Sequence, residues 1–152
     1  MITIKPHHFM DIIKLYGRGI ENFVPNHEYN HNVYGVANEI INNHEVEIKT
    51  TLVQDDICKP CKYIGKDGAC VDCIGHIKGI TSKNEWNRII DNRIVEYANV
   101  LKDDIYSAHQ YCEILYSIRE YIFDIWKEES NAMKEERYNS FCNGAKKYLG
   151  LI

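Results

Sequence analysis

The sequence of 152 residues contains no apolar run near the ~20 residues that a membrane-spanning helix requires. Residues 1–8 also lack the basic flank, the long apolar stretch and the small-residue cleavage site of a secretion signal. From these two absences we expect a cytoplasmic protein that has no membrane partner. In that compartment thiols stay reduced and structural disulfides are rare.

A strong charge of one sign is also missing. The 18 Lys and Arg and the 22 Asp and Glu leave a net charge of −4 at pH 7, which gives no electrostatic reason to expect a nucleic-acid partner. The sequence has no Gly-rich nucleotide loop and no recognisable set of nucleophile, base and orienting residue. Whether the protein is an enzyme therefore stays open at this level.

Cysteine, in contrast, is concentrated in the middle of the chain, as two Cys-x2-Cys pairs. The first pair is Cys58 and Cys61, and the second pair is Cys70 and Cys73. The eight-residue gap between them carries two glycines and a Lys-Asp-Gly sequence, so the chain can turn back and bring the pairs face to face. Each pair can direct two thiolates at one ion or cluster. The spacing predicts a metal site with these four ligands, and two disulfides are the disfavoured alternative.

The identity of the metal cannot be decided from four thiolates, which suit a structural zinc, a single iron or an iron–sulfur cluster. The gap of eight residues is shorter than the ~15–20 residues common in zinc modules with two such pairs, which favours a cluster. A cluster predicts an electron carrier or redox sensor that works with a redox partner protein. Zinc predicts a domain whose fold the metal stabilises and whose role is to bind a partner, and that alternative stays open.

Hydrophobic periodicity predicts one α+β domain over residues 1–152, mostly helical, with four to five helices. A short N-terminal strand and a strand over residues 46–53 are expected to form a small sheet. Two capping boxes, one at Ser82 and one at Ser107, predict helix starts, and the second opens an apolar stripe of about five turns. The metal loop, residues 55–76, then lies between a strand and a helix. The expected helices are 6–16, 33–41, 83–101, 108–126 and 133–147.

Three motifs of the first half together resemble a known family. His7-His8 follow the first strand, Gly17-Arg18-Gly19 comes ten residues later, and Asp55-Asp56-Ile57-Cys58 opens the cysteine segment. These motifs are similar to those of a family of small bacterial and archaeal proteins of unknown function that are thought to bind an iron–sulfur cluster. The resemblance implies a cluster-binding protein but no reaction. Family members tend to have a cysteine where Asp11 stands here.

Three residues outside the cysteine pairs are candidates for cofactor binding: His7, His8 and Arg18. Adjacent helical residues point about 100° apart, so we expect only one of the two histidines to reach a given site. Histidine suits acid–base or ligand roles near neutral pH, so an enzyme that uses the His7/His8 region is a further alternative. Arg18 can meet an anion, or it can simply end a helix.

The remaining histidines and cysteines give weaker signals. His27 and His31 have the four-residue spacing of a helical metal pair without the H-E-x-x-H order, so a solvated helix face is expected. Asp55 and Asp56 are expected either to accept hydrogen bonds from loop N–H groups or to form a turn that stops the strand. His76 is at best a substitute ligand. Cys112 falls on the polar side of the helix stripe and is expected to be a small, partly buried hydrophobic residue. Of these two outside cysteines, Cys142 is the better candidate to approach the metal, but the sequence does not predict that it does.

Overall fold

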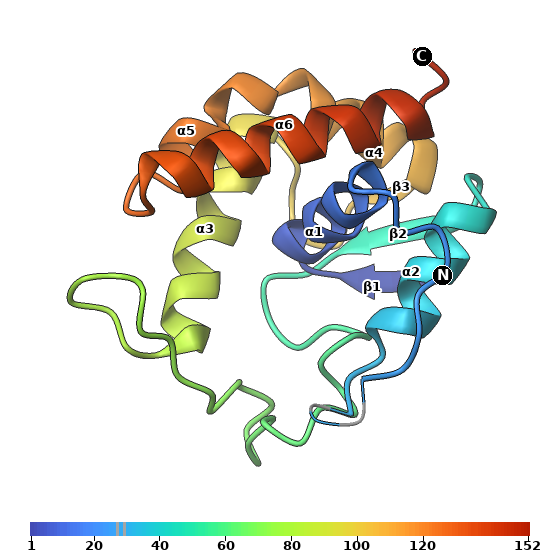
Figure 1. Ribbon diagram of the computed structural model, residues 1–152. Coiled ribbons are helices and arrows are strands. Elements are labelled where there is room, and N and C mark those ends of the chain that lie inside the picture. Colours follow the sequence, from blue (N-terminus) through green and yellow to red (C-terminus); the bar gives the residue numbers. More distant parts are fainter. Residues whose placement is uncertain (27, 29) are drawn as a thin grey trace.

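The computed structural model describes residues 1–26, 28 and 30–152, and about 49% of the chain is helical. Within these residues there are six α-helices and a three-stranded sheet, which confirms the predicted α+β, mostly helical fold (Figure 1). None of these helices is both long and apolar enough to cross a membrane. The elements in chain order are β1 (Ile2–Ile4), α1 (Pro6–Gly17), α2 (Val33–Asn42), β2 (Glu47–Thr50), α3 (Lys83–Ala98), β3 (Ile105–Ser107), α4 (Ala108–Ser117), the 3-10 turn η1 (Arg119–Tyr121), α5 (Ile122–Ile125) and α6 (Asn131–Tyr148).

The sheet has the order β1-β2-β3, with β2 in the centre. Strand β1 pairs with β2 in parallel, with Ile2 opposite Ile48, and β3 pairs with β2 in the antiparallel direction. The predicted strand over residues 46–53 is shorter than expected, since only Glu47–Thr50 keeps the pairing. Strand β3 was not predicted, because three residues are too few for an alternating pattern to stand out.

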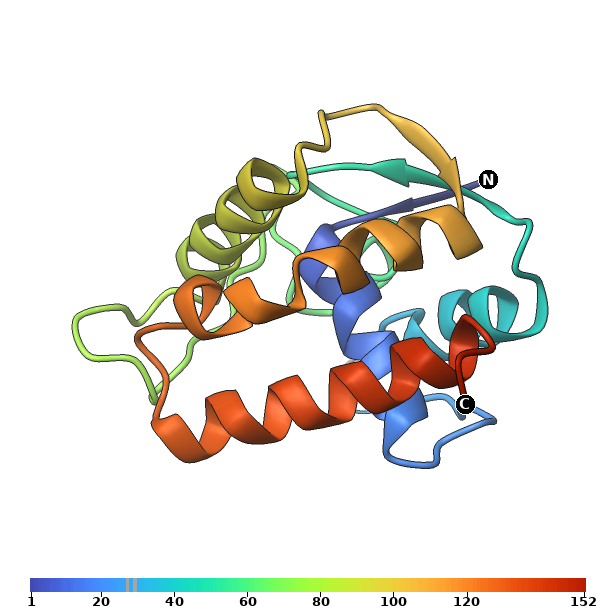
Figure 2. The same ribbon diagram turned by 90° about the horizontal axis from the view of Figure 1, so that it is seen from above.

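Helix α1 lies in the middle of the molecule, between the sheet and α6 (Figures 1 and 2). Its apolar side chains Phe9, Ile12 and Ile13 are fully buried. The backbones of α1 and α6 approach so closely that a Cβ atom on Gly144 would lie 1.9 Å from the carbonyl oxygen of Ile13. Only glycine fits at such a contact. This packing fixes the position of the helix that carries the histidine pair.

The predicted five-turn helix after Ser107 is wrong as a continuous element. Helix α4 ends at Ser117, and the chain continues through η1 into the short α5. The Ser117 hydroxyl donates to the Ile114 carbonyl, and Arg119 donates to the Tyr116 carbonyl, so side chains occupy acceptors that a longer helix would use. The apolar stripe is buried nonetheless. Cys112, expected to be a partly buried hydrophobic residue, is fully buried, because α6 packs against α4.

Residues 51–82, which we call the cysteine loop, connect β2 to α3 without a helix or a strand. Two isolated bridges order the loop: Ile64 pairs with Cys70, and Cys73 pairs with Ser82. The loop ends where the Ser82 hydroxyl accepts a hydrogen bond from the Glu85 N–H and caps α3, as predicted. In Figure 1 the loop (green) hangs on the side of the molecule opposite α6.

Candidate metal centre

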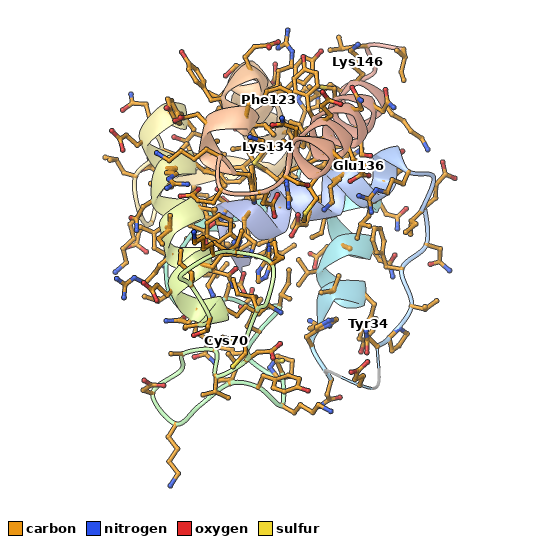
Figure 3. The ribbon with its side chains drawn as sticks, turned by 60° about the vertical axis from the view of Figure 1, so that its left-hand side comes forward. Tyr34, Cys70, Phe123, Lys134, Glu136 and Lys146 are labelled. Carbon is orange, nitrogen blue, oxygen red and sulfur yellow. The ribbon has the colours of Figure 1, made fainter. Side chains whose placement is uncertain are left out.

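A cavity of about 580 Å³ lies where the cysteine loop meets helices α1, α3 and α6. Three of the four predicted ligands line it: Cys58, Cys61 and Cys70. Cys73 is exposed and is not part of the lining. In Figure 3, Cys70 lies below α3, far from Phe123 and Lys134 on the helical side. The loop thus turns back as the spacing predicts, but only one cysteine of the second pair lines the cavity.

The ligand-type atoms that lie closest together come from three different residues. Within the described part of the chain, a single group of at least three His, Cys, Asp or Glu ligand atoms lies within 4.8 Å of one another, and it consists of His8, Asp55 and Cys58. The four cysteine sulfurs do not form such a group there. Cys58 of the first pair is therefore the cysteine that lies beside helix α1.

Asp55 joins the start of helix α1 to the first cysteine pair. Its Oδ2 accepts hydrogen bonds from the Lys5 N–H at 2.9 Å and from His8 Nδ1 at 2.6 Å. Its Oδ1 accepts a bond from the Cys58 N–H at 3.0 Å. Burial raises the pKa of this carboxyl, but His8 and these donors outweigh burial and hold the pKa well below its usual range. Of the two predicted roles for Asp55, the structure confirms that of hydrogen-bond acceptor.

His7 is anchored in the same way, to a carboxylate of another element. Its Nδ1 lies 2.9 Å from both oxygens of Asp91 in α3, and its backbone N–H donates to the same side chain. The rings of His7 and His8 are 4.2 Å apart, and both line the cavity. Asp55 and Asp91 thus hold both rings at the cavity, but only His8 belongs to the group of ligand atoms with Cys58, and the expectation that one of the two reaches a given site stays a prediction.

The charges near the first cysteine pair favour a bound cation. Burial lowers the pKa of His8, but the attraction of Asp55, with Asp11 and Asp91, outweighs it and raises the pKa. Burial raises the pKa of the Cys58 thiol to about 12, and the negative charge of Asp55 acts in the same direction. A metal ion would oppose both effects on the thiol, because metal binding favours the thiolate.

The wall of the cavity opposite the cysteine loop carries a charged network that the sequence patterns did not indicate. Arg137 lies over the ring of Trp126 at 4.2 Å and donates to Asp11 and to the buried Glu129. Glu129 also meets Nε2 of His76 at 3.2 Å, so this histidine has a carboxylate partner. One signal was present in the sequence, because Asp11 stands three residues after His8 and therefore lies on the same helix face.

The other residues singled out in the sequence lie elsewhere or differ from expectation. Arg18 is the C-cap of α1, pairs with Glu136 and Ser140 of α6, and is not in the cavity lining. Cys142 is buried in α6 and does not line the cavity either. His31 does line the cavity and precedes α2, so its expected place on a solvated helix face is wrong. His27 lies outside the described residues.

No family model, curated protein or solved structure matches this chain. The resemblance noted in the first half of the sequence thus stays a prediction, and function has to be inferred from the cavity itself.

Proposed function

We propose that this protein binds a metal centre on the cysteine side of the cavity, with an iron–sulfur cluster as the favoured group, and that it acts in electron transfer or redox sensing. The supporting observation is the convergence of three cysteines and two carboxylate-anchored histidines on one cavity. The thiolates of Cys58, Cys61 and Cys70 would hold the group, and Cys73 is the fourth ligand that the sequence predicts. When bound, the cluster supplies one-electron chemistry.

The residues present fit such a group. Three thiols project from a loop that has no regular structure, so small backbone adjustments can bring them to one centre. The Asp55 carboxylate fixes the backbone of Cys58 and the ring of His8, which is the support that ligands of a metal usually receive from their neighbours. The buried side chain of Ile57 and the half-buried Ile64 and Ile74 limit the access of water.

Zinc is the alternative occupant, and one observation favours it. The closest group of ligand atoms mixes a histidine nitrogen with a thiol, a donor set that zinc accepts readily. A zinc ion there would staple the cysteine loop to helix α1 and make the protein a structural module that binds a partner. Metal analysis separates the two cases.

The test is elemental analysis combined with visible absorption of protein prepared without oxygen. A cluster predicts brown protein that contains iron and sulfide, and Cys58→Ser, Cys61→Ser and Cys70→Ser are each expected to lose most of both. Cys142→Ser is the matched control, because Cys142 lies outside the cavity lining. Colourless protein that contains one zinc per chain would refute the cluster and support the zinc alternative. Protein that binds neither metal would refute a metal centre altogether.

A second candidate function is an enzyme, favoured by the pair of His7 and Asp91. The carboxylate holds Nδ1 of the ring, so Nε2 is left as a proton acceptor on a cavity whose volume is typical of small-molecule sites. A thermal-shift screen of small metabolites on metal-loaded protein tests this. A ligand that stabilises the wild type and the His109→Asn control, but not His7→Asn, supports the enzyme. A screen in which no ligand distinguishes these variants counts against it.

A further inference from the structure

A ring nitrogen of His8 lies within 4.8 Å of a cysteine sulfur, that of Cys58. Asp55 can only accept hydrogen bonds when ionised, so the Nδ1 that faces it carries the proton. In the neutral ring the other nitrogen, Nε2, then has a free lone pair, and a metal that displaces the Nε2 proton of the charged ring finds the same form, in which histidine binds metals. His8 also belongs to the group of ligand atoms that lie within 4.8 Å of one another.

We infer that His8 is a ligand of the metal centre, so that the protein ligands are Cys58, Cys61, Cys70 and His8, and Cys73 is not required. This inference rests on the proposed function, because it names the ligand that completes the same site. It gives His8, Asp55 and Cys58, which form the group of ligand atoms within 4.8 Å, different roles. Cys58 and His8 bind the metal, and Asp55 orients them.

Asp55 is the least suitable ligand of that group. Its two oxygens already accept hydrogen bonds from Lys5, His8 and Cys58, and its side chain is fully buried. A metal at Asp55 would compete with these three donors for the carboxylate oxygens, and the displacement of a donor would leave a buried N–H without an acceptor. A metal that binds His8 instead, with Asp55 hydrogen-bonded to the opposite ring nitrogen, leaves all of these hydrogen bonds in place.

The two other candidates for the fourth ligand are Asp11 and Cys73. Asp11 lines the cavity, but its carboxylate pairs with Arg137 at 3.1 Å and with Lys14 at 3.4 Å. Cys73 is exposed outside the lining, and its backbone is tied to the start of α3 through the bridge to Ser82. His8 alone among the three is on the cavity wall, held in place, and close to a cysteine.

The charge of the surroundings supports a neutral ligand. The carboxylates of Asp11, Asp55 and Asp91 all act on the His8 ring, and of these Asp11 is balanced by Arg137 and Lys14. A centre held by three thiolates and one imidazole is one charge less negative than a centre held by four thiolates, and repulsion from the carboxylates is smaller. In iron–sulfur proteins, replacement of thiolate by histidine raises the reduction potential.

X-ray absorption at the edge of the bound metal tests the inference for iron and for zinc. The wild type is expected to show the outer-shell scattering of one imidazole beside the sulfur shell; for zinc, the nitrogen lies at about 2.0–2.1 Å and sulfur at about 2.3 Å. His8→Cys is expected to lose the imidazole signal while it still binds metal. Asp55→Asn is expected to keep the signal and to lose about 10–100-fold in metal affinity.

The control variants are Cys73→Ser and Asp11→Asn, and both are expected to keep the metal content and the imidazole signal of the wild type. An all-sulfur shell in the wild type would overturn the inference and leave the metal centre intact. Loss of metal in Cys73→Ser, with His8→Cys unchanged in its spectrum, would also overturn it. Absence of bound metal from the wild type would instead refute the proposed function, so the two failures are distinguishable.

Discussion

The contact between helices α1 and α6 and the cysteine loop are stabilised in opposite ways. The helix contact is built from fully buried apolar residues, among them Ile13 and Phe141, around a meeting point of two glycines. In residues 51–82 the only buried apolar residues are Ile57 and Ile77. Backbone hydrogen bonds to β1 and to the residue before α2, together with the carboxylates of Asp55 and Asp56, hold the loop where apolar packing is sparse.

This difference places the candidate site at the border between a rigid part and an adaptable part of the molecule. Helix α1 presents His7 and His8 from a packed core, while the cysteines come from a segment that has little apolar burial of its own. Segments with few buried apolar contacts open at lower free energy than a packed core. A bound metal would therefore stabilise the loop far more than the helices.

The largest effect is expected at the helix contact, from Gly144→Val. A Cβ atom there would lie 1.9 Å from the Ile13 carbonyl oxygen, which belongs to the backbone and cannot move aside. We expect unfolding in urea to show a loss of more than about 3 kcal/mol. Gly75→Ala in the cysteine loop is the control, because a Cβ atom at Gly75 meets nothing within 4 Å. Similar losses of unfolding free energy in both variants would contradict the conclusion that the helix contact is packed more tightly than the cysteine loop.

The next effect concerns the polar anchor of the loop. Asp55→Ala removes the acceptor of the Lys5 and Cys58 N–H groups, and each buried donor without a partner costs about 1–3 kcal/mol. We expect metal-free protein to lose about 2–3 kcal/mol in urea unfolding. Asp67→Ala, at an exposed turn of the same loop, should change little. An unchanged midpoint for Asp55→Ala would show that the carboxylate does not anchor the loop.

A smaller effect is expected from Tyr148→Phe on the helical side. The Tyr148 hydroxyl donates to the Ile40 carbonyl at 2.7 Å and links α6 to α2 inside the core. Removal of one such bond, with the ring retained, is expected to lower the free energy of unfolding by about 1 kcal/mol. Metal affinity should not change, because neither residue lines the cavity. A loss of metal binding in this variant would mean that the two regions are coupled.

The smallest effect is a dependence of stability on pH that lies away from the candidate site. Burial and the neighbouring His109 lower the pKa of His44, whose ring stacks on Tyr148 at 3.8 Å. A histidine with a lowered pKa contributes stability above its unfolded pKa of about 6.5, and the contribution is lost as the pH falls. Unfolding of His44→Gln between about pH 7 and 5 is thus expected to depend less on pH than that of the wild type. Equal slopes would contradict this.

The fold class and most element positions followed from local patterns. Apolar spacing predicted α1 and α2, and the hydroxyl caps at Ser82 and Ser107 marked where α3 and α4 begin, because all of these signals act within a few residues. The break after Ser117 escaped prediction, since the apolar stripe continues through it. The apolar pattern indicated which side chains are buried there, and it did not indicate where the helix ends.

The sequence by itself determined which residues are able to bind metal and which segment carries most of them, since thiol chemistry and short spacing are local properties. Only the tertiary structure decided which of them meet. Asp55 and Asp91 stand 47 and 84 positions after the histidines that they orient, and no local period links such positions. Cys73 and His8 illustrate the result. Cys73 belongs to the second cysteine pair and yet lies outside the cavity lining, whereas His8, far from that pair in sequence, lies on the wall. The reason is that tertiary packing sets distances that chain spacing does not.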